Sequence, residues 1–104
     1  MAPREGTGIH EKQDLREEVD EPQMYHVVML NDDYTTRFFV IWVLMKLFGK
    51  TYEAAEQIMY DVHYKGRGLA GTYTYDIART KARHTEQLAR DNGYPFKVVT
   101  EPAA

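Results

Sequence analysis

Hydrophobic and polar positions change their pattern several times along this chain. Residues 1–22 hold almost no hydrophobic anchor, whereas residues 25–30 form a run rich in β-branched and aromatic side chains. That run ends at Asn31, Asp32 and Asp33, residue types that start turns by bonding nearby backbone. Such a run bounded by turn formers is typical of a strand. The pattern therefore predicts a buried strand over 25–30 that opens into a polar loop.

A strongly apolar helix is predicted after this loop. Ten of the eleven positions from 38 to 48 are apolar, with Lys46 as the exception. Thr35 or Thr36 can cap the helix at its start, and Gly49 can end it in the left-handed conformation. A helix that is apolar nearly all round must be buried on most sides or present one face to a partner.

The rest of the chain predicts four more elements with ordinary start and stop residues. The first is a helix over 52–63, capped by Thr51, whose apolar stripe at helical spacing faces the core. The others are a strand over 69–73, a helix from a Thr74 cap to about Arg90, and a strand opened by Pro95 in which Phe96, Val98 and Thr100 share one face. The expected order is β-α-α-β-α-β in one domain over residues 23–104.

Composition narrows the class of protein. The 104 residues allow one modest core and hence one domain. Cysteine and serine are both absent, which excludes disulfides, thiolate metal sites and the commonest nucleophiles. No basic stripe marks a nucleic-acid partner, and the longest apolar run is far short of the ~20 residues that a bilayer requires. We therefore expect a soluble cytoplasmic protein.

Charge is concentrated at the beginning of the chain. Residues 1–22 carry seven acidic and three basic side chains. A charged segment without hydrophobic anchors cannot bury enough apolar area to offset the entropy of ordering. The sequence therefore predicts a flexible N-terminal arm over 1–22, joined to a core domain over 23–104.

Residues 66–71 match the dinucleotide-binding pattern GxGxxG letter for letter. That motif must follow a strand and open a helix so that backbone amides meet a pyrophosphate. Here the glycines follow a predicted helix and open a predicted strand. The pattern therefore indicates a tight turn plus a closely packed glycine.

A polar cluster at the end of the first strand offers candidate chemistry. With His63, the residues Asp32 and Asp33 supply two carboxylates and an imidazole, which suits a metal-dependent hydrolase or a general acid/base pair. A structural interpretation is a turn that caps the following helix, with His63 as an ordinary helix-end residue. A third is a receptor for an ammonium group, because Asn31, Asp32 and neutral His63 supply acceptors beside an apolar surface. Residue chemistry alone leaves these alternatives open.

Several of these residues also carry a family resemblance. Residues 25–35 read YHVVMLNDDYT, and they are followed by Phe39-Val40, Val62-His63-Tyr64, Gly71 and Thr80-Lys81. This series closely resembles the ClpS family of N-end-rule adaptors for the Clp protease. The resemblance runs from about Met24 to Glu101, with the same order of elements. It implies an α+β domain with a three-stranded antiparallel sheet on three helices, similar to the C-terminal domain of the ribosomal stalk protein.

The resemblance also implies a function without catalysis. A non-enzymatic, monomeric adaptor would bind N-degron proteins through a free α-amino group and a first residue Leu, Phe, Tyr or Trp. It would then deliver them to the N-domain of the unfoldase ClpA or ClpC, with no cofactor and no metal. The implied residues are Asn31, Asp32, His63 and Asp33 for the amine; Met29, Thr35, Arg37, Val40, Val43, Met59, Val62 and Phe96 for the hydrophobic pocket; and Asp76 and Lys81 for unfoldase docking.

The chain departs from the family pattern at the rim of the implied pocket. Typical bacterial members read T-P-M-E-F where this chain reads Thr35-Thr36-Arg37-Phe38-Phe39. A charged, branched Arg37 at the rim can narrow the set of accepted side chains or stack over an aromatic one. Phe38 is either a surface patch for the unfoldase or extra core. These two positions leave the breadth of ligand specificity open.

Overall fold

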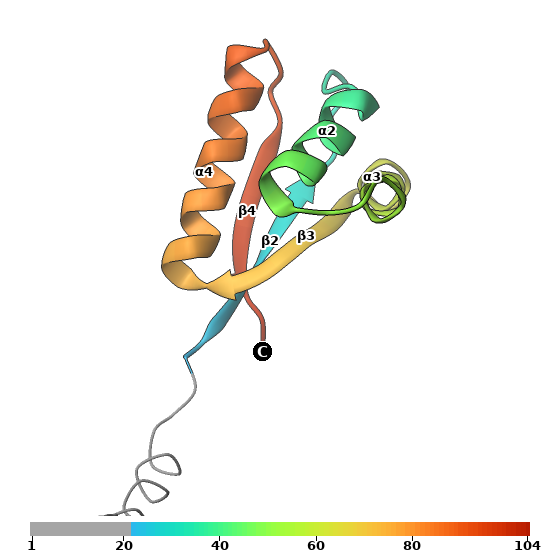
Figure 1. Cartoon of the computed structure of the whole chain (residues 1–104). Helices are drawn as coiled ribbons and strands as arrows, with labels where there is room; N and C mark the ends of the chain where they lie inside the picture. Colours follow the sequence, from blue (N-terminus) through green and yellow to red (C-terminus); the bar gives the residue numbers. More distant parts are fainter. Residues whose placement is uncertain (1–21) are drawn as a thin grey trace, which may run out of the picture.

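The computed structural model describes residues 22–104, so the predicted arm over 1–22 lies outside the described residues except for Pro22. The described elements follow the predicted order, β-α-α-β-α-β (Figure 1). Their bounds are β2 Met24–Leu30, α2 Arg37–Phe48, α3 Tyr52–Lys65, β3 Arg67–Thr74, α4 Tyr75–Asp91 and β4 Lys97–Pro102. The expected α+β class is confirmed.

The three strands form one antiparallel sheet with β2 in the centre, in the order β3-β2-β4. The sheet twists behind α2 and α4, which lie beside each other in Figure 1. Alternate residues of β2, namely Val27 and Met29, join the core together with Ala70 of β3 and Val98 of β4. Because side chains alternate across a strand, one face of the sheet supplies the core that the helices cover.

Caps fix where the first helix begins and ends. Thr36, and not Thr35, is the N-cap of α2, since its Oγ1 accepts a hydrogen bond from the amide of Phe39 at 3.1 Å. Gly49 ends the helix with φ +65°, a left-handed conformation that suits glycine. Thr51 caps α3 by the same device, accepting from the amide of Ala54. Polar residues with matched spacing thus place both helices.

Several predicted boundaries are wrong, among them that of β3, which spans Arg67–Thr74 and not 69–73. The last strand begins at Lys97 and not at Pro95, because Arg90 Nη1 donates to the carbonyls of Tyr94 and Phe96 at 3.0 and 2.9 Å. Those carbonyls are therefore bonded to a side chain of α4. The helix α3 also extends two residues past the predicted end at residue 63.

The glycines of the GxGxxG pattern have structural roles, as predicted. Gly66 has φ +89° and ends α3. Gly68 lies where β3 passes close to α3, and a Cβ added there would meet the Ile58 carbonyl oxygen at 2.9 Å and Val62 Cγ2 at 2.7 Å. Only glycine allows this approach of backbone to helix.

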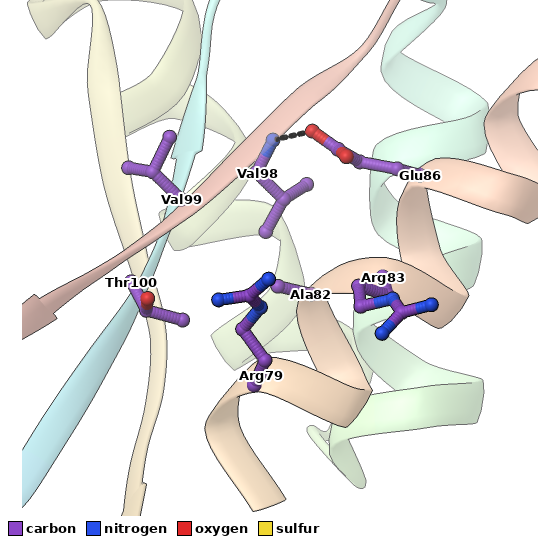
Figure 2. Close-up of a pocket in the computed structure, with 7 residues that line it drawn as sticks. All are labelled: Arg79, Ala82, Arg83, Glu86, Val98, Val99 and Thr100. Atoms are coloured by element: carbon purple, nitrogen blue, oxygen red, sulfur yellow. Dashed lines mark hydrogen bonds between the residues drawn. The ribbon is translucent and has the colours of Figure 1, made fainter. Parts of the chain in front are cut away.

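An open hollow of about 370 Å³ lies between α4 and the outer edge of β4 (Figure 2). Arg79 and Arg83 of α4 line it together with Val98 of β4. Glu86 Oε2 accepts a hydrogen bond from the Val98 amide at 2.9 Å. The carboxylate of Glu86 thus satisfies a backbone N–H group that an edge strand would otherwise offer to a strand of another chain.

Candidate functional site

The polar loop after β2 lies against the end of α3. The amide of Asn31 donates to the carbonyl of Gly66 at 3.1 Å. That bond connects the first residue of the loop to the residue that caps α3, three positions after His63. The fold therefore brings together two polar segments that lie far apart in the sequence.

Asp32 organises this loop. Its Oδ1 accepts from the amides of Tyr34 and Thr35 at 2.8 and 2.7 Å, and its Oδ2 accepts from the Thr35 hydroxyl at 2.7 Å. Partial burial acts to raise the pKa of Asp32, but the hydrogen bonds from Thr35 and Tyr34 outweigh it and hold the pKa below its ordinary value. Asp32 thus stabilises the fold above its ordinary pKa, and this contribution is lost as pH falls through its folded value.

Arg37 and His63 form a direct contact that connects α2 to α3. Arg37 is the first residue of α2, and its Nη2 lies 2.9 Å from His63 Nε2 in the last turn of α3. The guanidinium carbon also lies 6.0 Å from the ring centroid of Tyr64, whose ring meets that of His63 edge to face at 4.5 Å. No role for Tyr64 was predicted from the sequence, although its position next to His63 is a visible signal.

Apolar side chains lie one helical turn inside this contact. Val40 follows Arg37 by three positions in α2, while Met59 and Val62 precede His63 in α3. These belong to the predicted hydrophobic pocket, whose core members are each at most 4% exposed: Met29, Val40, Val43, Met59, Val62 and Phe96. All six belong to the one buried core cluster of the domain, and Val40, Met59 and Val62 lie within about a helical turn of Arg37 or His63 along α2 and α3. The predicted roles of Thr35 and Arg37 at its rim remain predictions.

The metal-dependent hydrolase finds no support in the described residues. Within 22–104, no group of three or more His, Asp or Glu side chains is placed to hold a metal ion. Nε2 of His63 is already engaged by Arg37, and Oδ1 of Asp32 by two backbone amides. Asp33 is exposed at the loop surface. The cluster offers hydrogen-bond acceptors more readily than a set of metal ligands.

Phe38 is not extra core. Its side chain is 77% exposed, and with Trp42, Phe39, Asn92 and Tyr94 it borders an aromatic hollow of about 270 Å³. The helix α2 therefore buries one face and exposes apolar side chains on another, the second of the two arrangements expected for a helix that is apolar nearly all round.

The two residues implied for unfoldase docking lie in α4 but differ in exposure. Asp76 is exposed in the first turn. Lys81 is half-buried, and its Nζ donates to the carbonyl of Leu47 at 2.8 Å. The same ammonium lies 5.5 Å from the Phe48 ring centroid and 5.4 Å from that of Tyr73. Lys81 therefore binds the carbonyl end of α2, which carries partial negative charge.

Lys81→Met is expected to lower the free energy of unfolding by about 1 kcal/mol, because it removes a charge-assisted hydrogen bond from a half-exposed position. Urea unfolding followed by circular dichroism measures this change. Arg83→Met, on the exposed side of the same helix, is the matched control and is expected to change stability by less than about 0.5 kcal/mol. Equal stabilities of the two variants would contradict the structural role of Lys81.

Fold and loop together define a small α+β domain in which a loop of hydrogen-bond acceptors is bonded to the end of α3. Comparison with protein families gives a more specific result. Residues 20–99 match the family model "ATP-dependent Clp protease adaptor protein ClpS". The chain belongs to the ClpS family and is an adaptor of the Clp protease.

Curated relatives extend over most of the chain. ClpS of Acetivibrio thermocellus is 46% identical over 91 residues, covering 88% of this chain and 92% of the relative. ClpS of Paracidovorax citrulli is 44% identical over 100 residues, covering 96% of this chain and 82% of the relative. The match thus includes most of each of these two adaptors.

A solved structure has the same fold. Agrobacterium tumefaciens ClpS2, bound to L-phenylalaninamide, superposes with a TM-score of 0.76 at 36% identity, covering 79% of this chain and 99% of that one. The predicted family and fold are therefore confirmed.

None of the helices among residues 22–104 has both the length and the apolar character needed to span a bilayer.

Proposed function

We propose that this adaptor binds proteins through a free α-amino group and a bulky hydrophobic first residue, Leu, Phe, Tyr or Trp. The observation that carries the proposal is the position of the acceptors. The loop that holds Asn31 and Asp32 is bonded to the end of α3, which carries His63, and buried apolar side chains lie one turn inside. L-phenylalaninamide, which A. tumefaciens ClpS2 binds, combines a free amine with an aromatic side chain.

The chemistry of the two halves is complementary to such a ligand. An ammonium has three N–H donors and a positive charge, so a site that binds it needs several hydrogen-bond acceptors and is favoured by a carboxylate. Asp32 supplies the carboxylate, and its Oδ2 accepts one hydrogen bond in the structure and so keeps capacity for another. A Leu or Phe side chain that becomes buried contributes about 1.5 to 3 kcal/mol. Each charge-assisted hydrogen bond adds about 1.5 to 3 kcal/mol, so affinities near micromolar are expected after ordering costs.

A peptide-binding experiment tests the proposal. Fluorescence anisotropy is measured with four labelled peptides that share one sequence: first residue Phe, the same peptide acetylated at its α-amine, first residue Ala, and Phe moved to the second position. The Phe-first peptide with a free amine is expected to bind at least about 30-fold more tightly than each of the others. Equal affinity for the free and acetylated peptides would show that the amine is not recognised.

The proposed partner for handover is the N-domain of the unfoldase ClpA or ClpC. Asp76 supports this assignment because it is exposed at the start of α4. Lys81 is half-buried and its ammonium is bonded to the Leu47 carbonyl, so it contributes less free charge to that surface than Asp76 does. We infer that a monomeric adaptor in the cytoplasm presents this end of α4 to the unfoldase and takes no part in peptide hydrolysis.

A further inference from the structure

The contact between Arg37 and His63 selects one tautomer of the neutral imidazole. A guanidinium has five N–H donors and no acceptor, so Nε2 of His63 must accept and Nδ1 must carry the proton of a neutral ring. A neutral imidazole has only one acceptor nitrogen. In the described structure, therefore, the acceptor that the proposed function assigns to the ligand's amine is occupied by a side chain of the chain itself.

We propose that Arg37 is a displaceable internal stand-in for the α-amine of the ligand, and that a peptide binds only after its amine replaces the guanidinium at His63. This inference rests on the proposed function and extends it to regulation of the same site. Both groups are cationic donors, so they cannot share Nε2. The guanidinium must leave before the ammonium arrives.

The position of Arg37 suits a group that moves away. It is exposed, and it is the first residue of α2, so its side chain can swing without breaking the body of the helix. Tyr64 can hold the guanidinium after it leaves His63, because the guanidinium carbon already lies 6.0 Å from the Tyr64 ring centroid. A guanidinium over an aromatic face keeps part of the stabilisation that it loses at His63, which lowers the free-energy cost of the displacement.

The contact also bridges the two helices that carry predicted pocket residues. Arg37 reaches from the start of α2 to the last turn of α3, and Val40 and Val62 lie on these helices, three positions after Arg37 and one before His63. Both of these valines are at most 4% exposed. When the amine displaces Arg37, the guanidinium no longer ties α2 to α3, and the two helices are free to part and admit the first side chain between them. In this way the two halves of ligand recognition become coupled.

The cost of displacement should be the same for every ligand with a free amine. When a binding-competent state is only partly populated, apparent affinity falls by that fraction for all ligands alike.

Arg37→Met removes the guanidinium and keeps a long, flexible side chain. It is expected to raise affinity by about two- to fivefold, the range for an exposed charged contact, and by equal factors for Phe-first and Leu-first peptides. Arg83→Met is the matched control and is expected to leave both affinities unchanged.

Fluorescence anisotropy with free-amine and acetylated forms of both peptides tests the proposal. An unchanged or reduced affinity in Arg37→Met would overturn it. A gain confined to Leu-first peptides would also overturn it, because that result identifies Arg37 as a filter of side-chain size. If neither the wild-type protein nor Arg37→Met distinguishes free from acetylated peptides, the proposed function itself fails, and the stand-in role fails with it.

A measurement without ligand separates these failures. Imidazole ¹⁵N chemical shifts of ligand-free protein report which nitrogen of His63 carries the proton. The wild-type protein is expected to show the proton on Nδ1, and Arg37→Met is expected to lose that preference. Identical ¹⁵N shifts in the two proteins would show that Arg37 does not occupy Nε2 in solution and would overturn the proposal, whatever the peptides do.

Discussion

Asp32→Ala is expected to weaken the binding of a Phe-first peptide by about 30-fold, the largest loss that one side chain of the loop can cause. The carboxylate is the negatively charged member of the proposed amine site, and a charge-assisted hydrogen bond contributes about 1.5 to 3 kcal/mol. Fluorescence anisotropy at fixed ionic strength measures the loss. Glu53→Ala is the matched control, because Glu53 is an exposed carboxylate in the first turn of α3, at the opposite end of that helix from His63, and it is expected to cost threefold or less.

Asp32 also holds the loop together, so the two effects of its removal must be separated. Thr35→Val deletes the hydroxyl that donates to Asp32 Oδ2 and leaves the carboxylate in place. If amine pairing dominates, Thr35→Val keeps most of the affinity that Asp32→Ala loses. Equal losses in both variants would mean that Asp32 acts only by ordering the loop.

The pKa of Asp32 gives a further check. Because its hydrogen bonds hold that pKa below the ordinary value, the carboxylate stays charged from pH 7 to pH 5. The ratio of wild-type to Asp32→Ala affinity should therefore be constant over this range. A ratio that falls steeply between pH 7 and pH 5 would contradict the assigned charge state.

Gly68→Ala is expected to lower the free energy of unfolding by about 2 kcal/mol or more. The added Cβ would lie 2.9 Å from the backbone oxygen of Ile58, and a helix carbonyl cannot move aside as a flexible side chain can. Strand β3 and helix α3 must then separate, which shifts His63 as well. Urea unfolding measures the stability, and the peptide-binding assay on the folded variant measures the displacement of the site.

Gly49→Asn is the matched control for that variant. Gly49 has φ +65° with nothing within 4 Å of an added Cβ, so the position needs left-handed backbone but not space. Asparagine tolerates this conformation, and the expected cost is below about 1 kcal/mol. Similar losses in the two variants would show that steric contact at Gly68 is not the deciding factor.

Local patterns predicted the elements well because caps and periodicity act within a few residues. Thr36, Thr51 and Gly49 lie at the ends of helices as expected. The start of β4 was predicted wrongly because Arg90 reaches from α4 to the carbonyls of Tyr94 and Phe96. A bond of that kind has no periodic signal in the sequence. Thr74 likewise occupies the N-cap position of α4 but makes no side-chain cap.

The candidate site was predictable in its composition but not in its contacts. The acceptors of the loop were evident because Asn and Asp end a strand there. The bond between Arg37 and His63 joins residues 26 positions apart, and the bond between Lys81 and the Leu47 carbonyl joins residues 34 apart. Both depend on how the helices lie across the sheet, which residue spacing does not express.

By itself, the sequence determined the α+β class, the order of elements, the absence of cysteine and serine chemistry and the acceptors offered to a ligand. These follow from side-chain type and short-range spacing. Only the tertiary structure decided that Arg37 is bonded to Nε2 of His63, that Lys81 is bonded to the end of α2, and that the side chains of the predicted hydrophobic pocket are buried in the core. The physical reason is that these contacts arise between elements, where long side chains have many possible partners and the fold selects one.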